Sequence, residues 1–493
     1  MYAGKVPALK GKTTRIFVKN ILFILFATLS LATSACSDDS ITAAGHLVSG
    51  GELDIENPTA AAVMSRSYST FDAGSPSFLD NSGFHSLRNS ALNNGYRNDQ
   101  PVGKYISFSS TTATRARLRM ATDPVYDRPV LDTEVGLTNG RGVYHLRNFV
   151  PGQKYYYAVT IGSDTLTSGT LSTKGQLRMI RVDGSWNIRD LGGWKGWNGN
   201  PVRYEWIYRG GSPGGQNLGG NTYSLSDADL AELHRIGIRA HLDLRALPGK
   251  GAWPEDGKQN AYSLGYTPLT DAEFINIATD FALFDATKSS AAVGDVAWII
   301  HQLKQGNPVY FHCRTGADRT GTMGYTLLGL LGCDAYTTPS GGNQIAIDYE
   351  LTSLGMDEEG TIAYNTRGTH PSQYSNRYAN AIATSGYNYF RTLRGLSVPG
   401  CPDADFQQRC YYYLNRYFLD NDVPTAGRVS ISKSDLDWFI NFMLGITDRE
   451  GNLQPGHTVR YEGPSWASDN PDLTLESAYT TAAANQYAVA QEQ

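Results

Sequence analysis

Apolar and charged side chains alternate along residues 115–120, which read Arg-Ala-Arg-Leu-Arg-Met. A period of two places one set of side chains in a core and the other in solvent, which predicts a half-buried β-strand. Residues 154–161 follow a Pro-Gly turn signal and are rich in Tyr, Val and Ile, which favour strands. The pattern therefore predicts β-structure over residues 104–174.

From about residue 179 the pattern changes to strands that alternate with helices. Ser226, Asp227 and Asp229 predict the start of a helix. The expected strands cover residues 239–245 and 309–311. The expected helices cover residues 292–305, 320–331, 342–353, 375–394, 406–421 and 433–444. This order predicts an α/β domain with a helical C-terminal half, followed from residue 447 by an extended tail.

The beginning of the chain has the pattern of an export signal. Basic residues precede an apolar run at 21–32, and small residues at 33–35 lead to Cys36. The run is too short for a membrane-spanning helix, which needs about 20 residues. The segment resembles a bacterial lipoprotein cleavage site, where Cys36 would be lipidated. The prediction is a chain exported and lipid-anchored to the bacterial outer membrane or cell surface; the alternative is ordinary secretion.

The composition indicates a folded, acidic chain. Of 493 residues, 41% are hydrophobic, which excludes a wholly disordered chain, and the length suggests two or three domains. The formal charge is −5, and removal of residues 1–35, with five bases and no acids, leaves 37 basic and 47 acidic residues, or −10. Proteins that bind nucleic acid present a basic face, so no nucleic acid is expected as a partner.

The chain has five cysteines, too few for a disulfide-dense scaffold, and their odd number leaves at least one thiol unpaired. Cys36 is assigned to the lipid. Cys401 and Cys410 could pair in an oxidising exterior, and Cys333 is expected to be buried and inert. Cys313 would then remain a free thiol, which is a liability outside the cell unless catalysis requires it.

Cys313 opens the segment that carries the most chemistry. It follows an apolar strand, and Arg319 stands after five more residues at the head of an apolar helix. The N–H groups of a loop closing onto a helix N-terminus bind phosphate oxygens, and the helix dipole favours a cysteine thiolate there. The planar guanidinium of Arg319 can hold two phosphate oxygens. The spacing predicts a phosphate-ester-cleaving site with Cys313 as nucleophile.

Neighbouring residues are expected to support this loop. Gly316 lets the backbone curl around the anion, Thr320 can donate its hydroxyl to the departing sulfur, and His312 is expected to fix the loop from beneath. The residues expected to bind phosphate are Arg314, Thr315, Gly316, Ala317 and Thr320. No cofactor is expected, and no cluster of His, Asp and Glu shows the spacing of metal ligands.

The loop resembles that of the Cys-x5-Arg phosphatases, which are the protein tyrosine and dual-specificity phosphatases. Further segments resemble the bacterial tyrosine/serine protein phosphatase family, whose members read NFRDLGG, YRSG, DLR, HCxAGKDRTG and DYxLT. The corresponding segments here are residues 187–193, 207–211, 243–245, 312–321 and 348–352. The resemblance covers about residues 180–445. Ala317 replaces the family's Lys, which disfavours highly charged phosphoinositides as substrates, although Arg314 is a candidate substitute.

The leaving oxygen needs a general acid, and a base must later activate water. Asp318, inside the loop, corresponds to the acid proposed for the family. Asp271 is the second candidate, because the wider superfamily often carries its acid on an upstream loop. Trp253-Pro254-Glu255 resembles the mobile acid loop of tyrosine phosphatases only superficially. Asp190 and Asp243 occupy motif positions and are expected to anchor loops by hydrogen bonds.

The resemblance implies hydrolysis of phosphotyrosine monoesters through a phosphocysteine, with phosphoserine and phosphothreonine as further candidates. The alternative enzyme is a scavenging phosphatase for inositol phosphates or other small phosphate esters. An alternative of another class is a surface binding protein with an inactive phosphatase domain. Expected partners are thus a phosphorylated protein, peptide or small ester, and the membrane through the lipid.

The segment 146–157 resembles the late strands of fibronectin type III modules. The fold expected is a small β-sandwich followed by an α/β Cys-x5-Arg phosphatase domain. The expected divisions are a lipoprotein signal peptide (1–35), a tether (36–50), the β-sandwich (51–174), the phosphatase domain (175–446) and the extended tail (447–493).

Overall fold

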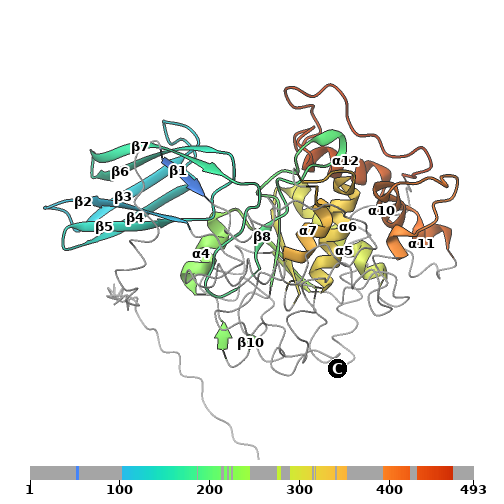
Figure 1. Cartoon of the computed structure of the whole chain (residues 1–493), viewed down its shortest axis with the longest axis horizontal. Coiled ribbons are helices and arrows are strands. Elements are labelled where there is room, and N and C mark those ends of the chain that lie inside the picture. The colour runs from blue at the N-terminus through green and yellow to red at the C-terminus, as the bar shows by residue number, and fades with distance from the viewer. Residues whose placement is uncertain are drawn as a thin grey trace, which may run out of the picture. The chain divides into compact units, whose positions relative to one another are not determined.

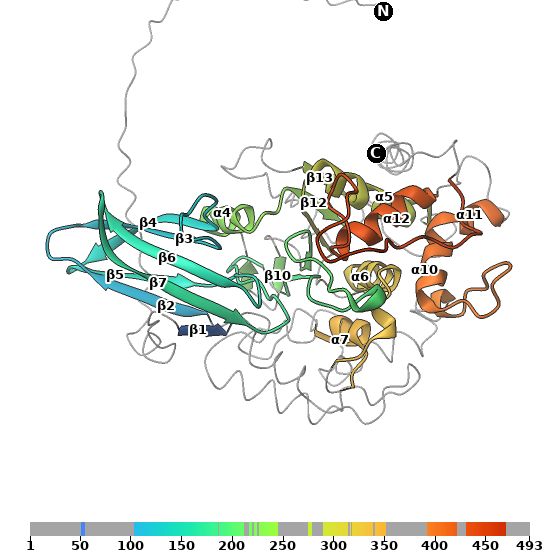
Figure 2. The same ribbon diagram turned by 90° about the horizontal axis from the view of Figure 1, so that it is seen from above.

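A computed structural model shows the arrangement of the chain (Figures 1 and 2). It describes residues 51–54, 103–185, 187–211, 216–218, 221–223, 226–244, 275–278, 289–313, 316, 318–338, 341–351, 392–421 and 430–469. These residues belong to one compact unit, which spans 44–493. None of the helices within the described ranges has the length and apolar character needed to cross a membrane. The predicted signal peptide and Cys36 lie outside the described residues.

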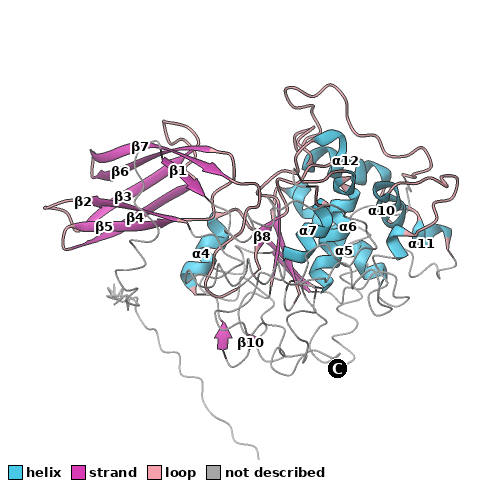
Figure 3. Ribbon diagram, viewed as in Figure 1, coloured by secondary structure: helices cyan, strands magenta, loops and turns pink. Residues whose placement is uncertain are grey.

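The N-terminal region is built of strands, as predicted (Figure 3). Its strands are β1 (Gly51–Asp54), β2 (Lys104–Ser109), β3 (Arg115–Ala121), β4 (Leu131–Thr138), β5 (Arg141–Leu146), β6 (Lys154–Ile161) and β7 (Asp164–Lys174). They are hydrogen-bonded in the order β1-β7-β6-β3-β4-β5-β2. We refer to this region, residues 103–174 with β1, as the β-module.

The alternation predicted for β3 is confirmed, because Leu118 and Met120 are buried while Arg115 and Arg117 are exposed. Leu118 and Met120 share one hydrophobic cluster with Phe108 of β2. Strands β4 and β5 are joined by a two-residue turn, Asn139-Gly140, in which both residues have positive φ angles of 51° and 77°. Such turns match the twist of a hairpin and favour Asn-Gly.

The second region has a five-stranded sheet in the order β13-β12-β14-β9-β8. Its strands are β8 (Arg189–Asp190), β9 (Ile207–Gly210), β12 (Ala240–Asp243), β13 (Ile275–Ala278) and β14 (Val309–His312). All pairs are parallel except β8 with β9. A separate antiparallel pair consists of β10 (Gln216–Leu218) and β11 (Asn221–Tyr223). The predicted α/β architecture is therefore confirmed for this region.

Helices cover both faces of this sheet. Along β14, Val309 and Phe311 belong to the main core, and Tyr310 belongs to a second cluster with α4. A strand that is covered on both faces reads as a continuous apolar run, which is the pattern of residues 309–311. The described helices are α4 (Asp227–Arg235), α5 (Ser289–Gln305), α6 (Asp318–Leu330), α7 (Gln344–Glu350), α10 (Phe406–Asn415), α11 (Tyr417–Asp420) and α12 (Lys433–Met443).

Three glycines in α6 allow close packing against it. A Cβ atom at Gly321 would lie 2.3 Å from the Tyr349 ring of α7, and one at Gly324 would lie 2.7 Å from the Arg209 guanidinium. A Cβ at Gly329 would contact Phe406 and Cys410 of α10. Glycine is unfavourable inside a helix, so its presence here reflects these close approaches.

Several predicted boundaries need correction. The helix expected at 406–421 is interrupted at Arg416, so α10 and α11 are separate. Residues 447–469, the described part of the predicted extended tail, contain no helix or strand. Tyr461 is buried in the main core and exchanges two hydrogen bonds with Asn441 of α12. The helix expected at 375–394 falls outside the described residues except for its last three.

Candidate active site

The loop after β14 places Cys313 and Arg319 at the junction of a buried strand and a helix. Cys313 directly follows β14 and is only 3% exposed, and Arg319 lies in the first turn of α6 and is partly exposed. The strand–loop–helix arrangement expected from the sequence is therefore present. Arg314, Thr315 and Ala317 lie outside the described residues, as does the side chain of Asp318, which begins α6.

Gly316 is held from outside the loop by two donors. Its carbonyl accepts hydrogen bonds from Asn187 Nδ2 at 3.3 Å and from the Arg209 guanidinium at 3.0 Å. These two hydrogen bonds fix the position of the Gly316 carbonyl from residues that lie outside the loop.

Only glycine fits at position 316. Its φ is +69°, in the left-handed region, and a Cβ atom would lie 2.4 Å from the Gly210 carbonyl oxygen. That oxygen belongs to the backbone of β9, so it cannot move aside cheaply. Gly210 is itself confined, because a Cβ there would lie 2.7 Å from the Tyr310 hydroxyl and 2.9 Å from Ile188. The serine of the related family would therefore not fit this backbone unchanged.

A fully buried cluster of two arginines and one aspartate lies beneath the loop. Asp348 of α7 accepts from Arg189 Nε at 2.9 Å through one carboxylate oxygen and from the Arg209 guanidinium through the other. Burial raises the pKa of Asp348, but the two guanidinium groups outweigh it and hold the pKa below its ordinary value. Burial, together with Arg189, lowers the pKa of Arg209 to about 10.

This cluster brings together segments that are far apart in the sequence. Arg189 also donates to the Asn187 side chain. Asp348 therefore holds both donors to the Gly316 carbonyl: it binds Arg209 directly, and it holds Asn187 through Arg189. These positions lie in the motif segments of the sequence, where no role was predicted for them. The available signal was the presence of charged residues inside otherwise apolar motif segments, as at Arg209 in β9.

His312 and Asp243 lie beside the nucleophile and are fully buried. His312 Nδ1 is 2.8 Å from the Cys313 carbonyl oxygen, and its Nε2 is 3.9 Å from an Asp243 carboxylate oxygen. The Thr320 hydroxyl is also buried and has no hydrogen-bond partner among the described residues. The hydroxyl is therefore not engaged by another described group, and the role expected for it toward the Cys313 sulfur stays a prediction.

Asp190 has the contacts of a structural anchor. Its carboxylate accepts hydrogen bonds from Arg178 at 3.1 Å, the Gly192 N–H at 2.9 Å and the Glu205 N–H at 2.8 Å. Burial raises the pKa of Asp190 to about 6, against the opposing effect of Arg178. The alternative acid, Asp271, lies outside the described residues, as do residues 253–255.

The other three cysteines within the described ranges do not share this environment. Cys333, Cys401 and Cys410 are free thiols in the structure, so the disulfide considered for Cys401 and Cys410 is not formed. Cys410 is fully buried in α10, whereas Cys401 is half-buried with its sulfur 3.8 Å from Gln408. Burial raises the pKa of both Cys333 and Cys410 well above the ordinary value, which disfavours their thiolates.

Comparison with known proteins agrees with the geometry. A model of the tyrosine phosphatase family matches residues 180–394, a range that includes Arg189, Arg209, Cys313, Arg319 and Asp348. A protein of Cupriavidus necator named "Putative tyrosine-protein phosphatase" is 28% identical over 163 residues, which are 30% of this chain and 55% of that protein. The chain thus spans about half the length of this curated relative. Residues 180–394 of the chain are thus similar to the tyrosine phosphatase family.

Proposed function

We propose that the chain hydrolyses phosphotyrosine monoesters through a covalent phosphocysteine. The observation that carries the proposal is the loop between β14 and α6, in which Cys313 and Arg319 flank a Gly316 carbonyl held from outside by Asn187 and Arg209. A recessed thiol, an arginine on the first helical turn and a loop braced by buried donors together form a site for a tetrahedral dianion.

In the first step, the Cys313 thiolate attacks phosphorus, an S–P bond forms and the P–O bond to the tyrosyl oxygen breaks. Asp318 donates the proton that this oxygen takes up on leaving. Arg319 binds two of the equatorial oxygens and follows them into the transition state. In the second step, water attacks phosphorus, Asp318 takes a proton from it and the S–P bond breaks, which releases inorganic phosphate. The Thr320 hydroxyl stabilises the departing sulfur.

The depth of the nucleophile supports phosphotyrosine as the main substrate. Because Cys313 is 3% exposed, its sulfur is recessed, and the aromatic ring of phosphotyrosine extends the phosphate further from the peptide backbone than a serine side chain does. The second candidate is a scavenging phosphatase for inositol phosphates and other small esters. What favours it is the export signal predicted for residues 1–35, since an exported enzyme meets few phosphoproteins of its own cell.

We expect the full chain to release phosphate from a phosphotyrosine peptide with a kcat/KM at least about tenfold above that for a phosphoserine peptide of the same sequence, a difference of about 1.4 kcal/mol in activation free energy. Inositol phosphates should be poorer still, because Ala317 supplies no extra cation. The measurement is inorganic phosphate release with each substrate, with and without a metal chelator, which should change nothing. A steep preference for inositol phosphates would replace the first candidate by the second.

We also propose that the mature chain is lipid-anchored through Cys36 and that the β-module is a sandwich of the fibronectin type III kind. The anchor rests on the basic, apolar and small-residue pattern before Cys36, and the sandwich rests on the single core shared by β2 and β3. In a Gram-negative host, Cys36→Ser should abolish incorporation of labelled palmitate into the protein, and Cys401→Ser should not. Equal labelling of the two variants would contradict the anchor.

A further inference from the structure

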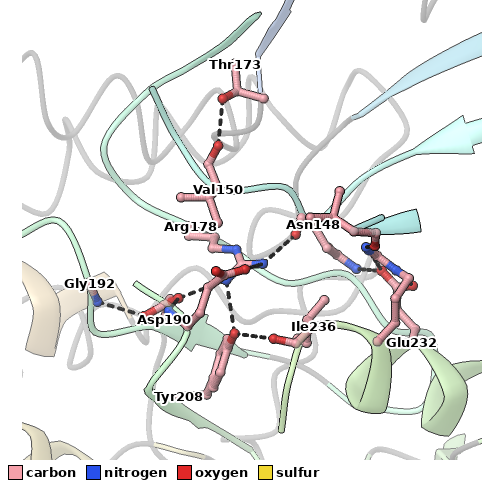
Figure 4. Close-up of polar contacts among 12 residues, drawn as sticks. Asn148, Val150, Thr173, Arg178, Asp190, Gly192, Tyr208, Glu232 and Ile236 are labelled. Carbon is pink, nitrogen blue, oxygen red and sulfur yellow. Dashed lines mark hydrogen bonds and ion pairs between the residues drawn. The ribbon is translucent and has the colours of Figure 1, made fainter. Parts of the chain in front are cut away.

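The β-module contacts the phosphatase region through Asn148, which lies outside the family match (Figure 4). Asn148 is buried and has a left-handed backbone, with a φ of 65°. Its side-chain nitrogen donates to the Arg181 carbonyl at 3.0 Å and to Glu232 at 2.6 Å, and its side-chain oxygen accepts from the Arg181 N–H at 2.6 Å. The side chain thus uses both its donor and its acceptor on the phosphatase region.

Arg178 extends this contact toward the sheet. The guanidinium is buried and donates to the Asn148 carbonyl at 2.9 Å, to Asp190 at 3.1 Å and to the Tyr208 hydroxyl at 3.0 Å. The Tyr208 hydroxyl in turn donates a hydrogen bond to the Ile236 carbonyl at 2.6 Å. Figure 4 shows these groups as one continuous network from the β-module to β8 and β9.

A second charged group belongs to this contact of Asn148 and Arg178 between the β-module and the phosphatase region, which we call the joint. Arg235 of α4 pairs with Glu232, donates to the Val130 carbonyl at 2.9 Å and lies over the Phe149 ring at 5.5 Å. Within the β-module, Thr173 donates to the Val150 carbonyl at 2.6 Å, which fixes the backbone two residues after Asn148. Separation of the two regions would break the hydrogen bonds that Asn148, Arg178 and Arg235 make across the joint, several of which have a charged donor or acceptor. The two regions are therefore joined by specific hydrogen bonds.

The joint and the phosphate loop contact neighbouring residue pairs of strands β8 and β9. In this strand pair Asp190 lies opposite Tyr208, and Arg189 lies opposite Arg209. Arg178 donates to both residues of the first pair. In the second pair, Arg189 donates to Asp348 and Arg209 donates to the Gly316 carbonyl. Adjacent residues of a strand point to opposite faces, so one short ladder links the joint on one face to the loop support on the other.

We propose that Asn148 is a positioning residue for the phosphate loop and that full phosphatase activity requires the β-module. The surface of the phosphatase region around Arg181 and Glu232 thus binds the chain's own β-module. This inference rests on the proposed phosphatase activity. Asn148 touches no substrate. Its side chain, bonded to Arg181 and Glu232, fixes the position of its own carbonyl, which accepts from Arg178. Arg178 in turn acts through strands β8 and β9, which carry the two guanidinium groups beneath the loop.

The test is Asn148→Gly in the full chain, which removes the side-chain contacts but keeps a residue that tolerates the left-handed backbone. The matched control is Asn139→Gly, since Asn139 is also left-handed and in the β-module but is exposed at the hairpin turn. We expect Asn148→Gly to lower kcat about tenfold, because small displacements of catalytic groups have large effects on rate. KM should stay within about twofold, because ground-state binding is less sensitive to geometry than the transition state. Asn139→Gly should match the wild type.

Vanadate, which forms a transition-state-like adduct with a cysteine thiolate, supplies a second readout: its inhibition constant should rise in parallel with the fall in kcat. A lower melting temperature with unchanged kcat and vanadate inhibition would reduce Asn148 to a structural role and overturn the proposal. If Asn148→Gly does not fold, Tyr208→Phe removes a single hydroxyl from the same network, and its kcat must also fall. Failure of the proposed function is seen separately, as absence of turnover by the wild type.

Discussion

Replacement of Cys313 by serine is expected to abolish phosphate release and to leave the protein folded. Serine is nearly isosteric with cysteine, and Cys313 packs in the main core, so the fold should tolerate the change. A hydroxyl is far less ionised than a thiol and is a much poorer nucleophile here. Loss of a nucleophile typically costs about 10⁴-fold or more in kcat, and that is the loss we expect.

The measurement is kcat with p-nitrophenyl phosphate and with a phosphotyrosine peptide, together with acid-quench trapping of phosphoenzyme. The wild type should accumulate label on Cys313 and the variant should not. Cys401→Ser is the control, because Cys401 is half-buried and lies outside the site. Normal turnover by the Cys313→Ser variant would end the phosphocysteine mechanism.

The second large effect is expected at Asp348, where Asp348→Asn should destabilise the protein by about 3–5 kcal/mol, as does loss of one partner from a buried ion pair. The variant leaves two buried guanidinium groups, Arg189 and Arg209, without their counter-charge. Activity should also fall, because Arg209 and Asn187 would no longer be held against the Gly316 carbonyl. Urea unfolding and kcat are the two measurements.

Asp420→Asn is the matched control. Asp420 also pairs with an arginine, Arg416, but the side chains of this pair are 23% and 34% exposed. Exposed pairs contribute about 0–1 kcal/mol, so the control should lose less than about 1 kcal/mol. Equal losses in the two variants would show that burial of the Asp348 cluster has no energetic consequence, contrary to the prediction.

The pH dependence of unfolding tests the same cluster. The guanidinium groups, which outweigh the effect of burial, lower the pKa of Asp348 in the folded state. A carboxyl with a lowered folded pKa contributes stability above its unfolded value, and this contribution is lost as the pH falls through the folded pKa. The stability difference between wild type and Asp348→Asn should therefore be complete at neutral pH and should begin to shrink below about pH 4.

The sequence alone determined the elements next to the nucleophile. The apolar run 309–311 and the helix that begins at Asp318 are local patterns, and Cys313 and Arg319 are separated by only five residues. The start of α4 was also readable, because Ser226 and Asp229 form a capping box between residues three apart. Such features are predictable because the partners that stabilise them lie within a few residues along the chain.

The break between α10 and α11 and the packing of Tyr461 depend on contacts that no local pattern encodes. The cluster beneath the loop is a clearer case: Asp348 lies 159 residues from Arg189 and 139 from Arg209, and its pairing with both became visible only in three dimensions. The joint is similar, since Asn148 reaches Glu232 across 84 residues.

The physical reason is the cost of burying charge. A buried carboxylate or guanidinium is stable only beside a partner that satisfies it, and any of many charged residues in the chain could serve as that partner. The sequence therefore predicted which residues of the loop carry its chemistry. Only the tertiary structure decided that Asp348 would brace the loop through two arginines, and that the β-module would be joined to the same strands through Asn148 and Arg178.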